Sequence, residues 1–492
     1  MNRPFHFSFR LSTPAAALAL AVVSGPVAAA FNSGSTGADG VFNPTVTTTV
    51  TLPESGILNY TTVNIPAGVT VYFKKNTTNT PVVMLASGNV TIAGSINVSG
   101  GGSTNVGAAG DGAIGDDGVP GVGGPGGYAG GRGGQPGQQG ATGLGPGAGG
   151  YGRVDTYNGN YLVGAGGAGF ANAGSQGNYY YYGNSPNNGG VAYGAASLLP
   201  LIGGSGGGGG MGGGSFAASG GGGGGGALLI ASSATLNIAG SIYADGGSGG
   251  ASTGQGCGST GGGGSGGAIR LIATTLTGNG TLSANYGSGG SPSGCTYGYG
   301  GGTGSVGRIR LEAESITRTA TSNPAHSFAA PGPVFISGMP TLKITSVAGQ
   351  TVPDAPTGVG DVSLPSTTAN PVNVTFATTG VPVGNTIKLT VTPASGSPTT
   401  ATSPALSGDT SAATASVAIS LPNGPSTLLA TVTYTVVASV GDALSIYAAN
   451  ERVESVTLQA GLGGGESKAI LRTVSGKEFT VPASVLARAA AG

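Results

Sequence analysis

The sequence predicts an all-β protein: parallel β-helix-like repeats with a glycine-rich, polyglycine II-like insert, followed by an immunoglobulin-like β-sandwich. Three observations predict this class. Glycine fills 104 of the 492 positions, and charged residues make up only 7%, where about 25% is usual. A strand-like phrase recurs through the glycine-rich region. Short alternating apolar runs, typical of antiparallel strands, follow it.

Residues 1–30 have the pattern of a Sec-type signal peptide. Two arginines precede an apolar stretch from Ala15 to Val23, and the segment ends in small residues before Phe31. The apolar stretch falls well short of the roughly 20 residues that a membrane helix needs. We therefore expect a secreted or surface-located protein with no membrane span once the signal peptide is removed.

A repeated phrase predicts coils in residues 31–100 and 227–335. Residues 85–101 are matched by residues 230–247, a third copy begins at Ile272, and a fourth, partial copy begins at Ile309. In the first two copies, apolar residues alternate in two pairs on either side of an Ala-Gly step. Alternation with period two indicates strands with one buried face, and the Ala-Gly step predicts a corner between them. Stacked coils would bury a ladder of Val, Ile and Leu.

The two cysteines occupy similar places in successive repeats. Cys257 and Cys295 follow the openings of two neighbouring repeats by about 30 residues, so stacking would bring them near each other. Because an exported protein enters an oxidising compartment, we expect a disulfide between them. The alternative is two free thiols in loops.

The insert, residues 101–226, carries glycine with a period of three. The series comprises Gly112, Gly115, Gly118, Gly121, Gly124, Gly127, Gly130 and Gly133, then, in a shifted frame, Gly134, Gly137, Gly140 and Gly143. Three residues per turn is the period of the polyproline II helix, in which glycine on one edge lets neighbouring chains approach closely. We expect packed polyglycine II-like helices, with disorder as the alternative. The shifted frame and the few prolines argue against collagen.

The last third predicts a sandwich and a tail. Residues 336–460 contain about seven short alternating runs, including one at Leu444 and Ile446, separated by Gly, Pro and Ser-rich turns. In residues 461–492, two apolar runs flank Ser475-Gly476, which predicts a hairpin. This tail would cap the sandwich or offer an edge strand to a partner.

The phrase Gly266-Gly267-Ala268-Ile269-Arg270-Leu271 resembles phrases in glycine-rich exported bacterial proteins. The packed-glycine arrangement is similar to the glycine-rich bundles of certain phage tail adhesins and of a small arthropod antifreeze protein. The resemblance covers residues 31–335 and rests on low-complexity motifs. It implies a β-helix and polyglycine II surface protein, and it carries over no catalytic residue.

Few residues are candidates for a site. Asp111, Asp116 and Asp117 lie in glycine-rich sequence and are the only weak candidates for a metal, which would be calcium. Adjacent acids in a loop are more often simply solvated, so we expect no cofactor. His326 has no second histidine or nucleophile motif near it and is expected to be an exposed linker residue.

A tyrosine run is the other distinctive feature. Tyr179, Tyr180, Tyr181 and Tyr182 are consecutive, with more tyrosines nearby. Exposed rings would form a contact patch for a protein or a sugar. The alternative, which we favour, is that the rings cover glycine helices that have no side chains of their own.

Charge and motifs narrow the function. A net charge of zero without a basic patch argues against nucleic-acid binding. We expect a non-enzymatic structural or adhesive protein of the cell surface or extracellular matrix. It would contact matrix components or glycans, or associate with itself into fibres. One alternative is a polysaccharide-acting β-helix lyase or hydrolase, although converging carboxylates are scarce. A second alternative is an ice- or surface-binding module.

Overall fold

The computed structural model describes residues 30–53, 55–77, 79–105, 118–155, 159–179, 187–253, 258–295, 298–335, 339–353, 360–448, 451–464, 467–483 and 486. The chain divides between Ala30 and Phe31 into two units. Every described helix and strand lies in the unit Phe31–Gly492, and nearly all of these elements are strands. Parallel sheets are followed by antiparallel ones, which confirms the predicted all-β class.

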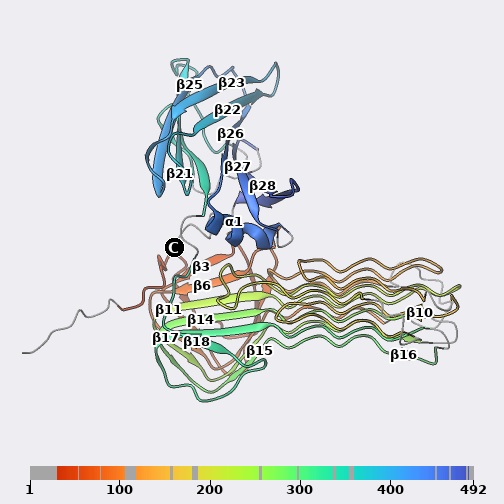
Figure 1. Ribbon diagram of the computed structural model, residues 1–492. Helices are drawn as coiled ribbons and strands as arrows, with labels where there is room; N and C mark the ends of the chain where they lie inside the picture. The colour runs from red at the N-terminus through yellow and green to blue at the C-terminus, as the bar shows by residue number, and fades with distance from the viewer. Residues whose placement is uncertain are drawn as a thin grey trace, which may run out of the picture. The chain divides into compact units, whose positions relative to one another are not determined.

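The repeated strands form two parallel sheets, and the turns of chain that run through both sheets are called the coils (Figure 1). The first contains β1 (Val41–Phe42), β3 (Ile57–Tyr60), β4 (Thr62–Ile65), β6 (Val82–Ala86), β7 (Val90–Ile92), β11 (Ala227–Ile238), β14 (Ala268–Thr277), β17 (Arg308–Ile316) and β18 (Ser327–Ala329). The second contains β2 (Thr48–Thr51), β5 (Thr70–Lys74), β8 (Ser95–Asn97), β12 (Ser241–Tyr243) and β15 (Thr281–Ser283). Each of the first two copies of the repeated phrase contains two alternating apolar pairs, one in the first sheet and the other in the second.

Strand register stacks the apolar residues of successive repeats. Leu236 in β11 lies opposite Val90 in β7 and Leu276 in β14. In the second sheet, residues at the corresponding positions of β8, β12 and β15 also pair and are buried. A thin apolar ladder is therefore buried between the two sheets, as the period-two alternation predicts.

The first half of β11 is buried on both faces. Leu228 and Ile230 point into the ladder, while Leu229 and Ala231 belong to a second apolar cluster that includes Val334. This second cluster lies on the outer face of β6, β11 and β14. Burial on both sides explains why these strands are continuous apolar runs.

Glycine at the corners permits close stacking. The N–H of Gly240 donates to the carbonyl of Ile92 at 2.7 Å. A Cβ atom on Gly240 would lie 1.8 Å from the carbonyl oxygen of Gly94, and one on Gly280 would lie 1.9 Å from that of Gly240. The coils therefore approach too closely at this corner for any side chain.

The glycine-rich segments form one lobe of extended chains beside the coils (Figure 1). Neighbouring segments hydrogen-bond through their backbones in steps of three residues. Gly131 donates to Gly207 at 2.8 Å, and Gly134 donates to Gly210 at 2.9 Å. A three-residue step on both partners is expected of chains with three residues per turn. The described part of the insert is therefore an ordered lattice.

Segment 203–213 is bonded on three sides. Residues three positions apart donate their backbone N–H groups to the same neighbouring segment, and the three series formed in this way face three different segments. Gly204 and Gly207 donate to the carbonyls of Gly225 and Gly222. Gly206 and Gly209 donate to the carbonyls of Leu144 and Ala141, and Gly208 donates to the carbonyl of Gly166. A surrounded segment needs glycine at almost every position, whereas a segment at the edge needs it less often. This difference explains both the uninterrupted glycine runs and the period-three series.

The lobe also receives glycine segments from the later repeats. Gly222 donates to Gly262, and Gly263 donates to Gly302, both at 2.9 Å. The lobe is therefore built from more than residues 101–226, because each later repeat sends the stretch between its strands into the same lattice. Four short strands complete it: β9 (Arg153–Val154), β10 (Leu162–Val163), β13 (Ser252–Thr253) and β16 (Pro292–Ser293).

The C-terminal part is two antiparallel sheets that share one core. One sheet contains β19 (Thr341–Val347), β20 (Gln350–Thr351), β21 (Val372–Thr379), β24 (Ser407–Asp409) and β25 (Ala412–Ile419). The other contains β22 (Thr386–Pro393), β23 (Thr399–Ala405), β26 (Ser426–Thr435), β27 (Val453–Leu462), β28 (Lys468–Thr473) and β29 (Glu478–Pro482).

One sequence interpretation changes here and another is confirmed. The strand expected at Leu444 is wrong: the chain forms the helix α1 (Ala438–Leu444) and the 3-10 turn η1 (Ser445–Tyr447), and Leu444 is buried in the sandwich core. A short apolar run fits either a helix or a strand, and packing decided between them. The tail hairpin at Ser475-Gly476 forms as expected, and it extends the six-stranded sheet with β29 at its edge.

Candidate functional site

Charged side chains gather on the outer face of β17. Arg310, Glu312 and Glu314 alternate along this strand. Glu312 accepts hydrogen bonds from Arg270 in β14 and Arg310, at 3.0 and 2.6 Å. Burial alone would raise the pKa of Glu312, but these two guanidinium groups outweigh burial and lower it. The carboxylate is therefore held in its charged form.

Arg270 ties a connecting segment to the coils. Its guanidinium donates to the carbonyls of Pro333 and Val334 at 2.8 and 3.1 Å. The Gly332 N–H donates to Glu312 at 2.8 Å. The arginine of the repeated Gly-Gly-Ala-Ile-Arg-Leu phrase thus has a structural role.

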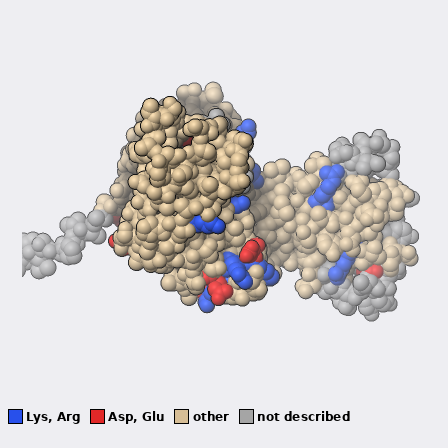
Figure 2. Space-filling model, turned by 90° about the horizontal axis from the view of Figure 1, so that it is seen from above, with Lys and Arg blue, Asp and Glu red and all other residues tan. Residues whose placement is uncertain are grey.

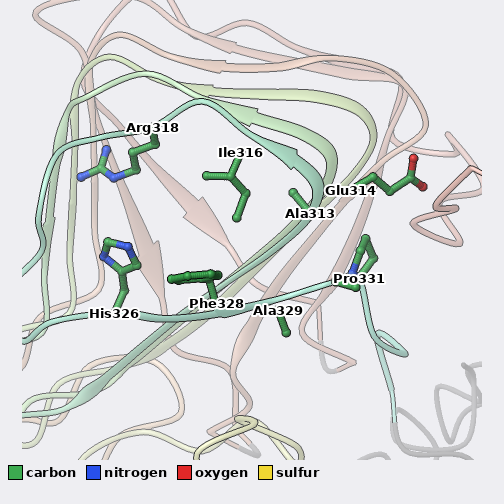
Figure 3. Close-up of a pocket in the computed structure, with 9 residues that line it drawn as sticks. Ala313, Glu314, Ile316, Arg318, His326, Phe328, Ala329 and Pro331 are labelled. Atoms are coloured by element: carbon green, nitrogen blue, oxygen red, sulfur yellow. The ribbon is translucent and has the colours of Figure 1, made fainter.

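A pocket of about 680 Å³ opens beside the last coil (Figure 3). Its lining is mainly apolar, including Ile316 and the exposed ring of Phe328. Arg318 also lines it, but its guanidinium donates to the carbonyls of Gly278 and Gly280 at 2.9 and 2.6 Å. The arginine is therefore engaged with the backbone of the neighbouring repeat and not with the pocket.

His326 lines this pocket and is half-buried, so the expectation of an exposed linker residue is wrong. Strand β18 follows it directly and pairs with β17, which draws the histidine against the coil. Burial, and then the positive charge of Arg318, lowers the pKa of His326. The ring is therefore neutral near pH 7.

Ser322 and His326 do not form a nucleophile and base pair. Ser322 Oγ lies 2.9 Å from His326 Nδ1 and donates its hydrogen to the Pro324 carbonyl at 2.8 Å. Since a hydroxyl has one hydrogen, Nδ1 must be the donor in the contact with Ser322. A base would have to accept that hydrogen, so the arrangement does not activate the serine.

Other predicted site residues fall partly outside the described chain. Asp111, Asp116, Asp117, Tyr180, Tyr181, Tyr182 and Cys257 all lie outside it. Tyr179 is described and half-buried. Cys295 is disulfide-bonded, and Cys257 is the only other cysteine in the sequence. In the part of the chain that is described, no group of three metal-ligating side chains comes together.

Tyrosines do pack against the glycine segments nearest the coils. Tyr193 is buried, and its hydroxyl donates to the Gly203 carbonyl at 2.6 Å and accepts from Ser205 at 3.0 Å. The Phe170 ring lies 4.7 Å from its ring. Tyr128 packs against the same cluster. These rings supply the apolar packing that glycine lacks.

The far end of the lobe carries short strands and larger side chains. Strand β9 pairs with β10 and β13 pairs with β16, and Figure 1 shows β10 and β16 at the end away from the coils. The rings of Tyr161 and Tyr299 lie 6.0 Å apart, and Cys295 follows β16 by two residues. Arg153 and Val154 form β9, and Val154 is 38% exposed. This end combines aromatic, cationic and apolar groups.

On the face drawn in Figure 2, charged side chains are sparse and stand in small groups. The charged pattern on β17 was missed in the sequence, where only the alternation of charges in a charge-poor chain could have signalled it. No helix among the described residues is long and apolar enough to cross a membrane. No family model, curated protein or solved structure matches this chain.

Proposed function

We propose that this is an exported, non-enzymatic structural or adhesive protein of a bacterial surface or matrix, and that it makes its contacts through the far end of the glycine lobe. The observation that carries the proposal is the distribution of side chains. Inside the lattice, backbone packs against backbone and few functional groups are available. Recognition needs side chains, and the far end of the lobe groups aromatic, cationic and apolar ones.

The charged groups support a structural reading. Arg270, Glu312 and Arg318 are buried and engaged with each other or with backbone carbonyls. A polysaccharide lyase or hydrolase needs carboxylates and bases that face an open groove. The described residues place no such group of carboxylates in the pocket beside the last coil, where Glu314 is the only acid.

The end of the lobe is also suited to binding by its stiffness. Each segment is held by backbone hydrogen bonds to several neighbours, so the short strands at the end are mounted on a preorganised base. Preorganisation reduces the entropy lost when a surface binds its partner. We therefore expect binding without conformational change in the lobe.

A binding experiment with two matched variants tests the proposal. The mature protein is passed over a panel of immobilised bacterial and plant polysaccharides, and release of reducing ends is measured on the same panel. We expect retention without product release. Val154→Asp should weaken retention at least tenfold, because it places a charge at the end of the lobe.

Val191→Asp is the control. Val191 is another exposed valine of the lobe, but it lies two residues from Tyr193, which packs beside the coils. We expect Val191→Asp to bind as the unchanged protein does. Equal retention of the two variants would overturn the proposed surface, and release of reducing ends would overturn the non-enzymatic proposal. Electron microscopy of the same sample shows whether the partner is a second copy in a filament.

A further inference from the structure

The backbone nitrogen of Phe31 lies beside a carboxylate that is 283 positions away in the sequence. Its N–H donates to Glu314 Oε1 at 2.6 Å. Phe31 is also the first residue of the unit Phe31–Gly492. The peptide bond between Ala30 and Phe31 is the one at which the sequence predicts cleavage of the signal peptide.

The residues that follow Phe31 are fixed to the coils by contacts of their own. Ser33 is buried, and its hydroxyl donates to the Ala86 carbonyl at 2.8 Å. Ser35 donates to the Tyr60 carbonyl at 2.7 Å. The Phe31 side chain packs against the apolar cluster on the outer face of β6, β11 and β14. These contacts hold residues 31–35 against the coils and place the Phe31 nitrogen beside β17.

Glu314 differs from the other acid on its strand. Glu312 is satisfied by Arg270, Arg310 and the Gly332 N–H. Among the described residues, none of the ion pairs uses Glu314. Its carboxylate is exposed and turns away from the centre of the pocket in Figure 3. Among the described residues, Glu314 therefore has no cation as a partner, although its carboxylate lies beside the Phe31 nitrogen.

Cleavage would supply that cation. Hydrolysis of the Ala30–Phe31 bond consumes one water, leaves a carboxylate on Ala30 and frees the nitrogen of Phe31 as an amine. An α-amino group has an ordinary pKa of about 7.7, so it is mostly protonated at pH 7. An amide with one N–H and no charge would become an ammonium group with three N–H bonds and a full positive charge.

We propose that Glu314 is the acceptor for the amino terminus created at Phe31, so that removal of the leader itself completes an ion pair that fastens the first residues to β17. The inference rests on the export part of the proposed function and is independent of the contact surface at the far end of the lobe. Glu314 is a positioning residue in this role.

The pKa of the Phe31 α-amino group is the readout. The rate of acylation by an N-hydroxysuccinimide ester is followed against pH by mass spectrometry of the N-terminal peptide, on protein that begins at Phe31. We expect Glu314 to raise this pKa by about 0.5, the size expected of an exposed ion pair. Glu314→Gln should return the pKa to its ordinary value.

The other charged groups near this site are unchanged in the test. They are Arg310 and Glu312 on β17, Arg270 on β14, and Arg318 and His326 in the lining of the pocket. Glu454→Gln, which removes an exposed carboxylate of the sandwich, is the matched control and should leave the pKa unchanged. Protein that begins one residue earlier, at Ala30, should also show the ordinary pKa because its amine is displaced.

Two results would overturn the inference. One is an equal α-amino pKa in the unchanged protein and in Glu314→Gln. The other is a different first residue when the full chain is exported by a bacterial host and its amino terminus is sequenced. Either result leaves the polysaccharide-binding test intact, so failure of this inference is separable from failure of the proposed contact surface.

Discussion

The guanidinium of Arg270 and the carboxylate of Glu312 form a bidentate ion pair in which each side chain is only 1% exposed. The pair joins two neighbouring coils, and the same two side chains bind residues 332–334. In a chain with few charges, this buried pair is a structural connection between the coils and the segment that leaves them.

Breaking the pair should destabilise the protein strongly. Glu312→Gln leaves the Arg270 charge buried without its carboxylate, and we expect a loss of about 3–5 kcal/mol in the free energy of unfolding. Urea unfolding followed by circular dichroism measures it. Asp442→Asn, which breaks the exposed pair with Arg452, is the control and should cost less than about 1 kcal/mol. Similar losses in both variants would contradict the assignment.

The same pair should make stability depend on pH in the acid range. The pKa of Glu312 is lowered in the folded protein, so its contribution is present above the unfolded value of about 4.3 and is lost as the pH falls through the folded value. The difference in stability between the unchanged protein and Glu312→Gln should therefore shrink below about pH 4. A difference that stays constant down to pH 2 would show that Glu312 does not titrate in this way.

Lattice glycines should not tolerate a methyl group. A Cβ atom on Gly206 would lie 1.9 Å from the Ala129 carbonyl oxygen, whereas one on Gly214 would meet nothing within 4 Å. We expect Gly206→Ala to lower stability by about 1–3 kcal/mol or more, because backbone must move. Gly214→Ala should be neutral within about 0.5 kcal/mol. Thermal unfolding compares the two, and equal effects would contradict close packing in the lobe.

Tyr60 should resist ionisation. Burial, and then the charge of Asp39, raises its pKa to about 12. Since the unfolded side chain ionises near pH 10, its contribution to stability is complete below pH 10 and falls as the pH rises towards 12. Ultraviolet titration of the protein and of Tyr60→Phe gives the difference spectrum of this residue. A midpoint near pH 10 would refute the prediction.

No thiol should be reactive in the protein as isolated. Cys295 is disulfide-bonded, and the sequence contains one other cysteine. Maleimide labelling in denaturant without reductant is expected to find no thiol, and labelling after reduction should find two per chain. Reduction should cost about 2–4 kcal/mol of stability. Labelling before reduction would disprove the bond.

Much of the coil and lobe structure could be predicted from the sequence, because it depends on local period. The Val90 and Ile92 alternation predicts β7, and the Ala-Gly step predicts the corner at Gly240. The glycine series predicts the three-residue step. Local pattern did not reveal that Gly130 and Gly131 donate to different neighbours, at Gly121 and Gly207. The two frames of the glycine series therefore mark two faces of one segment, and each face bonds to a different neighbour.

Other features depend on contacts between distant residues. From the sequence alone, the charged residues of β17 predict a solvent-exposed face. The structure shows that residues 332–334 cover Glu312. The helix at Leu444 depends on the sandwich core. The contact between Phe31 and Glu314 joins the two ends of the coil region. No local propensity contains these pairings, which is why the candidate site was less predictable than the fold.

The three-residue step in the lobe also sets the unit in which its length can change. Adding one residue to a segment such as 203–213 would rotate the rest of that segment by a third of a turn. The N–H groups that bond to one neighbour would then face a different neighbour. Adding three residues would restore every bond one step further along, about 9 Å away. Natural length variants should therefore differ by triplets that are matched across adjacent segments. Such variants would extend the reach of the lobe in fixed increments while its tip stays the same.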